Sequence, residues 1–129
     1  MKNIVVLGST GSIGTNTLEV ARNLKDKFRV VGLSAYSRWE LLADQVEEFK
    51  PAYVALNDAQ LLDKFKSRNN HKQTRILTGN DCLKEMVLNH DVDIVVSAVV
   101  GAAGLQAAIA TVQQGKILAL ANKESLVMA

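Results

Sequence analysis

Short apolar runs alternate with longer segments of helical period along the whole chain. The apolar runs, rich in Val, Ile and Leu, predict strands at residues 2–7, 28–35, 53–56, 75–78, 92–100 and 116–121. Between them, apolar residues three or four positions apart predict helices that begin near residue 13 and then cover residues 39–49, 58–66, 80–89 and 105–113. The pattern therefore predicts strand and helix in regular alternation.

This alternation, with short connections, favours a parallel sheet with helices on both faces. The near-continuous apolar strand at residues 92–100 is typical of a sheet that is covered on both sides. We predict a single α/β domain, a Rossmann-like doubly wound parallel sheet. In such sheets ligands bind beyond the carboxyl ends of the strands, where the strand order reverses. The stretches expected to converge there are residues 8–14, 36–38, 99–104 and 122–125.

Three glycines follow the first strand in the stretch LGSTGSIGTNTL, residues 7–18. Gly8 can adopt the backbone angles that let the chain leave the strand sharply, and Gly11 lets the main chain approach a ligand closely. Gly14 permits tight packing of the helix on the strand. The spacing G-x-x-G-x-x-G is one residue looser at its start than the usual dinucleotide fingerprint, so a glycine turn without a ligand is the alternative.

The helix after these glycines offers free N–H groups and the positive end of its dipole to an anion. The hydroxyls of Thr10 and Ser12 are expected at the same point, and Ile13 is expected to begin the buried face of the helix. No Gly-Lys-Ser/Thr follows, which excludes a nucleotide-hydrolase P-loop. A pyrophosphate group fits this pattern.

The second strand ends in SAYSRWE, residues 34–40, where the first acidic residue is Glu40. An NAD-binding unit would usually place an acidic residue at the strand end to hold the ribose 2′-hydroxyl. Ser37 and Arg38 stand where a 2′-phosphate needs a hydroxyl and a planar cation, which favours NADP. The alternative for Arg38 is a solvated charge at a helix start. Tyr36 is expected either to cover the adenosine or to seal the sheet edge.

Two further stretches follow the last two strands. In VVGAAGL, residues 99–105, Gly101 and Gly104 leave room for a flat nicotinamide ring, or serve a close helix-to-strand turn.

The last strand is followed by polar residues within LANKESLV, residues 120–127. Lys123 could hold a substrate anion, and Asn122 and Glu124 could bond amide or ribose groups. The competing interpretation is a helix N-terminal cap near Ser125.

Composition and charge narrow the classes of binding partner and the cellular compartment expected for this chain. The net charge of +2, from 15 basic and 13 acidic residues, gives no broad reason to expect nucleic acid. No apolar run is long enough to span a bilayer, and no secretory signal begins the chain. Cys82 is the single cysteine and is expected to be a buried apolar residue, consistent with a cytoplasmic protein. His71 and His90 stand apart from any ligand-spaced residues and are expected at the surface, so no metal site is predicted in this chain.

The segments GSTGSIG, VGAAGL and LANKESLV, in this order and spacing, resemble the NADPH-binding domain of the 1-deoxy-D-xylulose 5-phosphate reductoisomerase family. The resemblance implies a homodimeric enzyme of non-mevalonate isoprenoid biosynthesis that depends on NADPH and on Mg²⁺ or Mn²⁺. Such an enzyme rearranges 1-deoxy-D-xylulose 5-phosphate and reduces the resulting aldehyde by hydride transfer to 2-C-methyl-D-erythritol 4-phosphate.

Residue by residue, the resemblance implies that the cofactor phosphates lie on Thr10, Gly11, Ser12 and Ile13. It further implies cofactor contacts from Asn122 and Glu124 and a substrate contact from Lys123. At residues 36–38 family members commonly have Gly, a basic residue and Asn, whereas this chain has Tyr, Ser and Arg.

The resemblance also implies that the family's metal-binding carboxylates and most of its substrate-phosphate ligands lie beyond residue 129. We therefore expect residues 1–129 to be the cofactor domain without the catalytic and C-terminal domains, and to be inactive alone. One alternative is another NADP-dependent reductase, of the homoserine or aspartate-semialdehyde dehydrogenase type, against which ANKES argues. Another is a non-catalytic nucleotide-sensing Rossmann module.

Overall fold

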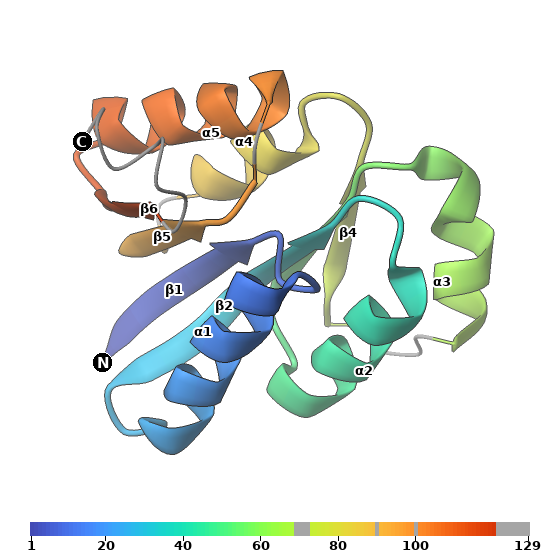
Figure 1. The fold of residues 1–129 in the computed structure, drawn as a ribbon, viewed down its shortest axis with the longest axis horizontal. Coiled ribbons are helices and arrows are strands. Elements are labelled where there is room, and N and C mark those ends of the chain that lie inside the picture. Colours follow the sequence, from blue (N-terminus) through green and yellow to red (C-terminus); the bar gives the residue numbers. More distant parts are fainter. Residues whose placement is uncertain (69–72, 90, 100, 121–129) are drawn as a thin grey trace.

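The computed structural model describes residues 1–68, 73–89, 91–99 and 101–120. Within them the strands are β1 (Lys2–Leu7), β2 (Phe28–Ala35), β3 (Tyr53–Leu56), β4 (Arg75–Thr78), β5 (Ile94–Ser97) and β6 (Ile117–Leu120). They form one parallel sheet in the order β4-β3-β2-β1-β5-β6 (Figure 1). The predicted doubly wound α/β fold is confirmed, and the strand order reverses between β1 and β5.

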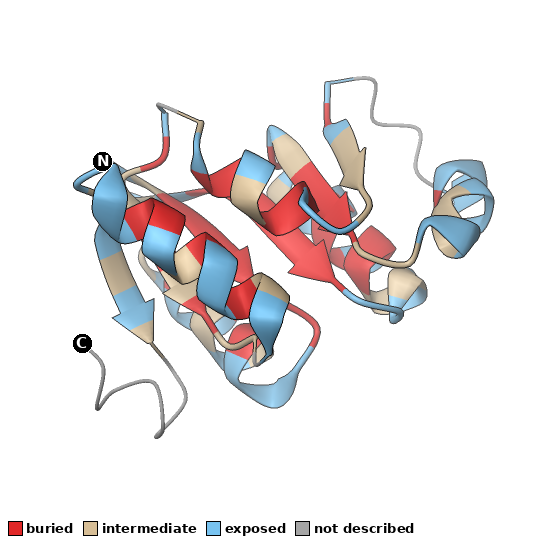
Figure 2. Cartoon of the chain, turned by 90° about the horizontal axis from the view of Figure 1, so that it is seen from above, coloured by how far each residue is buried: buried red, intermediate tan, exposed pale blue. Residues whose placement is uncertain are grey.

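Helices cover both faces of this sheet (Figure 1). The helices are α1 (Ser12–Asn23), α2 (Trp39–Phe49), α3 (Leu62–Arg68), α4 (Cys82–Val87) and α5 (Ala102–Gln113), with a 3₁₀ turn η1 (Ala59–Leu61) before α3. Side chains of α1, α2 and α3 share one buried cluster, and side chains of α4 and α5 share another. Figure 2 shows the buried residues concentrated along the central strands between these two helical layers.

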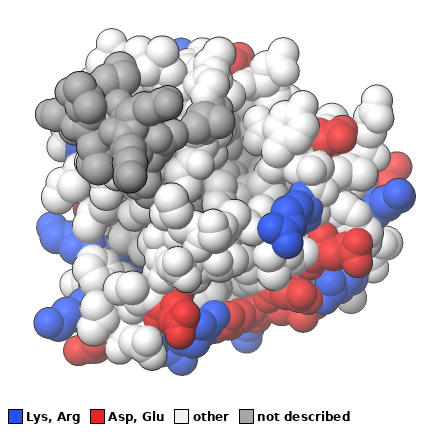
Figure 3. Space-filling model, in the orientation of Figure 1, with Lys and Arg blue, Asp and Glu red and all other residues white. Residues whose placement is uncertain are grey.

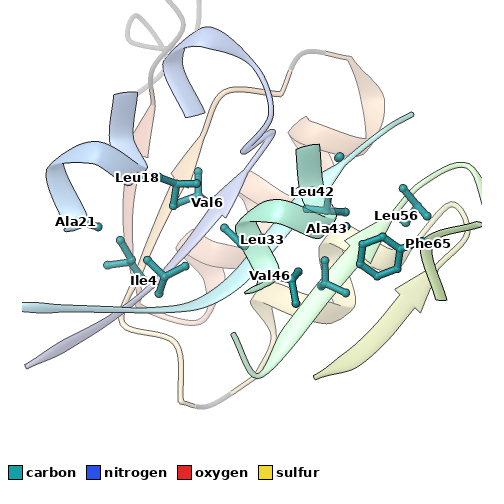
Figure 4. Close-up of a cluster of buried hydrophobic side chains, with 13 residues drawn as sticks. Ile4, Val6, Leu18, Ala21, Leu33, Leu42, Ala43, Val46, Leu56 and Phe65 are labelled. Carbon is teal, nitrogen blue, oxygen red and sulfur yellow. The ribbon is translucent and has the colours of Figure 1, made fainter. Parts of the chain in front are cut away.

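β1 explains why a strand can lack a polar face. Because side chains alternate along a strand, Ile4 and Val6 enter the cluster beneath α1 and α2, while Val5 and Leu7 enter the cluster beneath α4 and α5. The first cluster extends through Leu33, Leu42 and Val46 to Phe65, as Figure 4 shows. All of β1 from Ile4 onward is therefore core.

Several elements differ in length from the prediction. β5 ends at Ser97 rather than at residue 100, because the chain leaves the sheet once the Ala98 amide has bonded to the Leu7 carbonyl. α5 begins at Ala102, three residues earlier than predicted, because Gly101 takes a φ of +90° and alanines follow it. α4 is confined to Cys82–Val87.

The helix predicted at residues 58–66 begins as η1 instead. The Asp58 carboxylate accepts a hydrogen bond from the Gln60 amide, at 3.0 Å, and this bond starts the tighter turn. α3 then continues to Arg68.

β6 departs from the expectation of a sheet covered on both faces. It is an edge strand within the described residues, and Ile117 is 58% exposed. The outer side of α5 also leaves Leu105, Ile109 and Val112 exposed. Residues 1–120 therefore bury one side of the sheet less completely at this edge than in its centre.

Candidate functional site

The chain turns sharply where β1 ends, and two of its glycines are required by the protein's own packing. Gly8 has a φ of +76°, and a Cβ atom there would lie 3.2 Å from Cγ2 of Val99. A Cβ atom on Gly14 would lie only 2.1 Å from the Gly8 carbonyl oxygen. Helix α1 therefore starts directly against the end of β1, as predicted for these positions.

Gly11 is different, because nothing in the described structure demands a glycine there. Its φ and ψ of −79° and 173° suit any residue, and a Cβ atom would have only an ordinary 3.7 Å contact with the Gly8 carbonyl oxygen. The absent side chain instead leaves the main chain open on its outer side. A close approach by a ligand is what this glycine permits.

Next to Gly11, the first turn of α1 has amides that bond to no other described residue. The Thr15 amide, bonded to the Gly11 carbonyl at 2.9 Å, makes the first bond of the helix, so the amides of Ser12, Ile13 and Gly14 precede it. In the described part of the chain, no side chain caps this helix and its first turn has no acidic residue. The positive end of the helix dipole is thus available to an anion.

The expectation that Ile13 begins the buried face of α1 is wrong, because Ile13 is 43% exposed. The buried positions are Gly14, Leu18 and Ala21, which repeat at the helical period. Ile13 lies one residue, about 100° of helix rotation, away from that stripe. Its side chain therefore lies at the surface beside the glycine bend, residues 8–14.

The two hydroxyl residues of the glycine bend are placed differently. Ser12 is exposed at the helix start, so its hydroxyl is accessible, and its role as a donor to a ligand stays a prediction. Thr10 is only 6% exposed, so most of its side chain packs inside the protein. Its main-chain carbonyl accepts a hydrogen bond from Nη1 of Arg38 at 2.9 Å.

That bond brings the end of β2 to the glycine bend. Ser37 and Arg38 are exposed, in the turn before α2, so the cation and hydroxyl predicted to read a 2′-phosphate lie at the same edge as Gly11. Tyr36 is 73% exposed, which excludes the interpretation that it seals the sheet edge. Its alternative role over the adenosine remains a prediction.

A buried polar network beneath the bend was not predicted. The Gly8 amide donates to Oγ of Ser34, and the Ser9 amide donates to the Ser34 carbonyl, each at 2.8 Å. Gln45 of α2 bonds both the hydroxyl and the carbonyl of Ser9. A sequence signal did exist, since Gln45 lies on the apolar face of a helix whose other members include Leu42 and Val46.

The end of β5 completes the arrangement. The position of Gly8 against Val99 places the β5–α5 connection beside the bend. A Cβ atom on Gly104 would lie 2.5 Å from the Val99 carbonyl oxygen, which supports the packing interpretation of that glycine. A Cβ atom on Gly101, in contrast, would lie more than 4 Å from every other atom of the described residues apart from its chain neighbours.

The predicted convergence is thus confirmed for three stretches: residues 8–14, 36–38 and the described part of 99–104. The fourth, residues 122–125, lies outside the described residues, and so do Asn122, Lys123 and Glu124.

Other sequence expectations concern residues away from this edge. Cys82 is fully buried, as predicted, and burial raises the pKa of its thiol to about 11. His71 and His90 lie outside the described residues. Among the residues that the structure describes, no three His, Cys, Asp or Glu side chains gather as metal ligands would, and no helix is long and apolar enough to cross a membrane.

Figure 3 shows acidic and basic side chains intermixed along the lower rim of the molecule, with the middle of that face largely uncharged.

Comparison with known proteins identifies the family to which this chain is similar. Residues 4–129 match the family profile described as 1-deoxy-D-xylulose 5-phosphate reductoisomerase. Curated proteins of that name from Thermoanaerobacter pseudethanolicus and Chlorobium chlorochromatii are 48% and 43% identical over all 129 residues. This chain spans only 33% and 34% of their lengths, about one third.

Solved structures give the same result. The Zymomonas mobilis reductoisomerase in complex with NADPH superposes on 99% of this chain with a TM-score of 0.88 and 34% identity. A reductoisomerase in complex with NADPH, fosmidomycin and magnesium superposes on 100% of it with a TM-score of 0.87 and 39% identity. The chain covers 34% and 32% of these two proteins.

Proposed function

Since this chain belongs to the 1-deoxy-D-xylulose 5-phosphate reductoisomerase family, we propose that residues 1–129 form its NADPH-binding domain. The observation that carries the proposal is Gly11, a glycine that packing within the described residues does not require. It lies at the start of α1, where the first amides come before the first hydrogen bond of the helix. A pyrophosphate bound there would satisfy those amides and interact with the helix dipole.

The remaining contacts follow from the strand ends. Arg38 and Ser37 would bind the 2′-phosphate, and the open backbone at Gly101 would accommodate the nicotinamide ring. Lys123 would contact the substrate. The residues proposed to contact the cofactor are Gly8, Thr10, Gly11, Ser12, Ile13, Gly14, Ser37, Arg38, Gly101, Asn122 and Glu124.

For the whole protein we propose the family's reaction: conversion of 1-deoxy-D-xylulose 5-phosphate to 2-C-methyl-D-erythritol 4-phosphate by rearrangement and reduction. Bound NADPH would supply the hydride. The described residues of this chain offer no cluster of metal ligands, and the family resemblance is the reason that we propose a divalent-metal site in the part of the enzyme beyond residue 129. A cytoplasmic homodimer is the proposed state of the whole enzyme, and the single buried cysteine is consistent with that compartment.

Titration calorimetry of the 129-residue chain with NADPH and NADH, side by side, tests the cofactor proposal. We expect one NADPH per chain and weaker binding of NADH, because only NADPH offers a 2′-phosphate to Arg38. Equal binding of the two would overturn the NADP assignment, and binding of neither would overturn the proposal.

A second assay tests the division of labour between domains. The chain, supplied with 1-deoxy-D-xylulose 5-phosphate, NADPH and Mg²⁺ or Mn²⁺, should leave the absorbance of NADPH at its nicotinamide band unchanged. Substrate-dependent oxidation of NADPH by the purified chain would show that residues 1–129 carry the complete catalytic machinery.

A further inference from the structure

Both the oxygen and the nitrogen of the Gln45 side-chain amide form hydrogen bonds with one residue of the glycine bend. Its Oε1 accepts from the Ser9 hydroxyl at 2.7 Å, and its Nε2 donates to the Ser9 carbonyl at 2.8 Å. Ser9 is fully buried and Gln45 is 6% exposed. Both bonds therefore lie inside the protein, where polar groups that lose a partner are costly.

The position of Gln45 on α2 makes this use of an amide unexpected. Its neighbours on the helix, Leu42 and Val46, are fully buried apolar residues. An apolar side chain at position 45 would suit the same helix face without the cost of burying an amide. The amide is matched to Ser9, which indicates that the conformation of the bend, rather than the stability of α2, explains the glutamine.

Two consecutive peptides of the bend are held from outside it. Gln45 holds the Ser9 carbonyl, and Arg38 holds the Thr10 carbonyl. On the strand side, Ser34 holds the amides of Gly8 and Ser9. The Gly11 amide donates to the Gly8 carbonyl at 3.3 Å, and the amides of the proposed phosphate site, from Ser12 onward, follow directly. The peptide planes before that site thus have fixed orientations.

We propose that Gln45 is a positioning residue for NADPH: it fixes the Ser9–Thr10 peptide so that Gly11 and the first amides of α1 face the cofactor pyrophosphate. The inference rests on the proposed function. Gln45 itself is buried beneath the bend and acts only through Ser9. If the bend samples other conformations, only the competent fraction binds, and the apparent affinity falls by that fraction.

The test compares Gln45→Met, Gln45→Glu and the parent chain by NADPH calorimetry, with the melting temperature of each recorded. Methionine keeps the length of the side chain and removes both bonds, so we expect the dissociation constant to rise about tenfold or more. Thr74→Val is the matched control. It removes another buried bond, from the Thr74 hydroxyl to the Pro51 carbonyl at 2.7 Å, at the opposite edge of the sheet. It should lower the melting temperature and leave NADPH affinity unchanged.

Gln45→Glu adds a pH readout that general destabilisation would not produce. Burial raises the pKa of a carboxyl group above its ordinary value, so this side chain stays protonated to a higher pH than an exposed glutamate does. When protonated it can donate to the Ser9 carbonyl as the amide does. When ionised it places a carboxylate against that carbonyl. The ratio of its NADPH affinity to that of the parent should therefore rise as the pH falls.

Amide hydrogen exchange separates this inference from the proposed function. In Gln45→Met, exchange at Gly8, Ser9 and Gly11 should accelerate more than exchange in β3, whether or not NADPH is present. If the parent binds NADPH but Gln45→Met binds equally well, or Gln45→Glu shows no pH-dependent ratio, the inference is wrong. If the parent binds no NADPH, the proposed function and the cofactor role of Gln45 both fail, while accelerated exchange would still assign Gln45 to the bend.

Discussion

Nη1 of Arg38 lies 2.9 Å from the carbonyl oxygen of Thr10 and donates a hydrogen bond to it. This bond joins the turn between β2 and α2 to the turn after β1, two segments that only the parallel sheet brings together. A guanidinium has five N–H donors in a planar fork, so the bond leaves others for an anion. The bond thus orients the cation beside the glycine bend.

The first prediction concerns this cation. Arg38→Ala should weaken NADPH binding about tenfold to one-hundredfold, the range for losing a charge-assisted hydrogen bond, and should weaken NADH binding much less. Parallel calorimetric titrations measure both constants. Arg75→Ala, which removes an exposed arginine at the amino end of β4, is the control and should change neither. An equal loss for both cofactors would show that Arg38 acts only through Thr10.

Gly11→Ala should separate binding from folding. The added methyl group would have an ordinary 3.7 Å contact inside the protein, so the free energy of unfolding should change by less than about 1 kcal/mol. The same methyl group would occupy the space proposed for the pyrophosphate, so NADPH binding should be lost. Urea denaturation and calorimetry on one preparation measure the two effects. Retained affinity would mean that the cofactor does not approach Gly11.

Gly14→Ala, in contrast to Gly11→Ala, should mainly lower the stability of the fold. A Cβ atom 2.1 Å from the Gly8 carbonyl and 2.6 Å from Cα of Ser9 forces backbone to move, which costs several kcal/mol or prevents folding. The circular dichroism spectrum and the urea midpoint report this directly. A Gly14→Ala chain as stable as the parent would contradict the close packing of α1 on β1.

Cys82 should behave as a probe of unfolding. Its thiol is fully buried and desolvation raises its pKa to about 11, so at pH 8 almost no thiolate is present in the folded chain. Labelling with a disulfide reagent should be slow in buffer and rapid in urea beyond the unfolding midpoint. Fast labelling of the native chain would show that α4 opens locally or that the thiol is accessible.

The ion pair between α1 and α2 should contribute little to stability and should lose its effect in acid. Arg22 bonds the Glu48 carboxylate, at 2.7 Å from Nη2, and lies over the Phe49 ring, with 5.5 Å between its Cζ and the ring centroid. The hydrogen bond from Arg22 lowers the pKa of Glu48 below its ordinary value of 4.5. Its stabilisation is therefore present above that pH and is lost as the pH falls through the lowered pKa.

Both side chains are more than one third exposed, so Glu48→Gln should cost less than about 1 kcal/mol at pH 7. The difference from the parent should shrink as the pH falls through the lowered pKa of Glu48. Urea denaturation across this pH range measures it. Glu85→Gln, which neutralises an exposed carboxylate on the opposite helical layer, is the charge-matched comparison.

Local sequence patterns were sufficient to predict the bounds of the elements that depend on the periodicity of apolar residues. The bounds predicted for β1, β2, β3, β4 and α2 agree with the structure, because apolar runs and helical spacing are properties of neighbouring residues. The bounds of β5 and α5 were less predictable, since β5 ends where Val99 turns to pack against Gly8, a contact between distant segments.

The sequence by itself determined the parallel α/β fold and the segments that form the candidate site, because glycine spacing and strand ends are local features. Only the tertiary structure decided what supports that site. Ser34 and Gln45 lie 25 and 36 residues after Ser9 along the chain. Their bonds to Ser9 exist only once β1, β2 and α2 have packed together. The same packing exposes Ile13 and buries Gly14, because the helix stripe that faces the sheet is set by the direction in which α1 leaves β1.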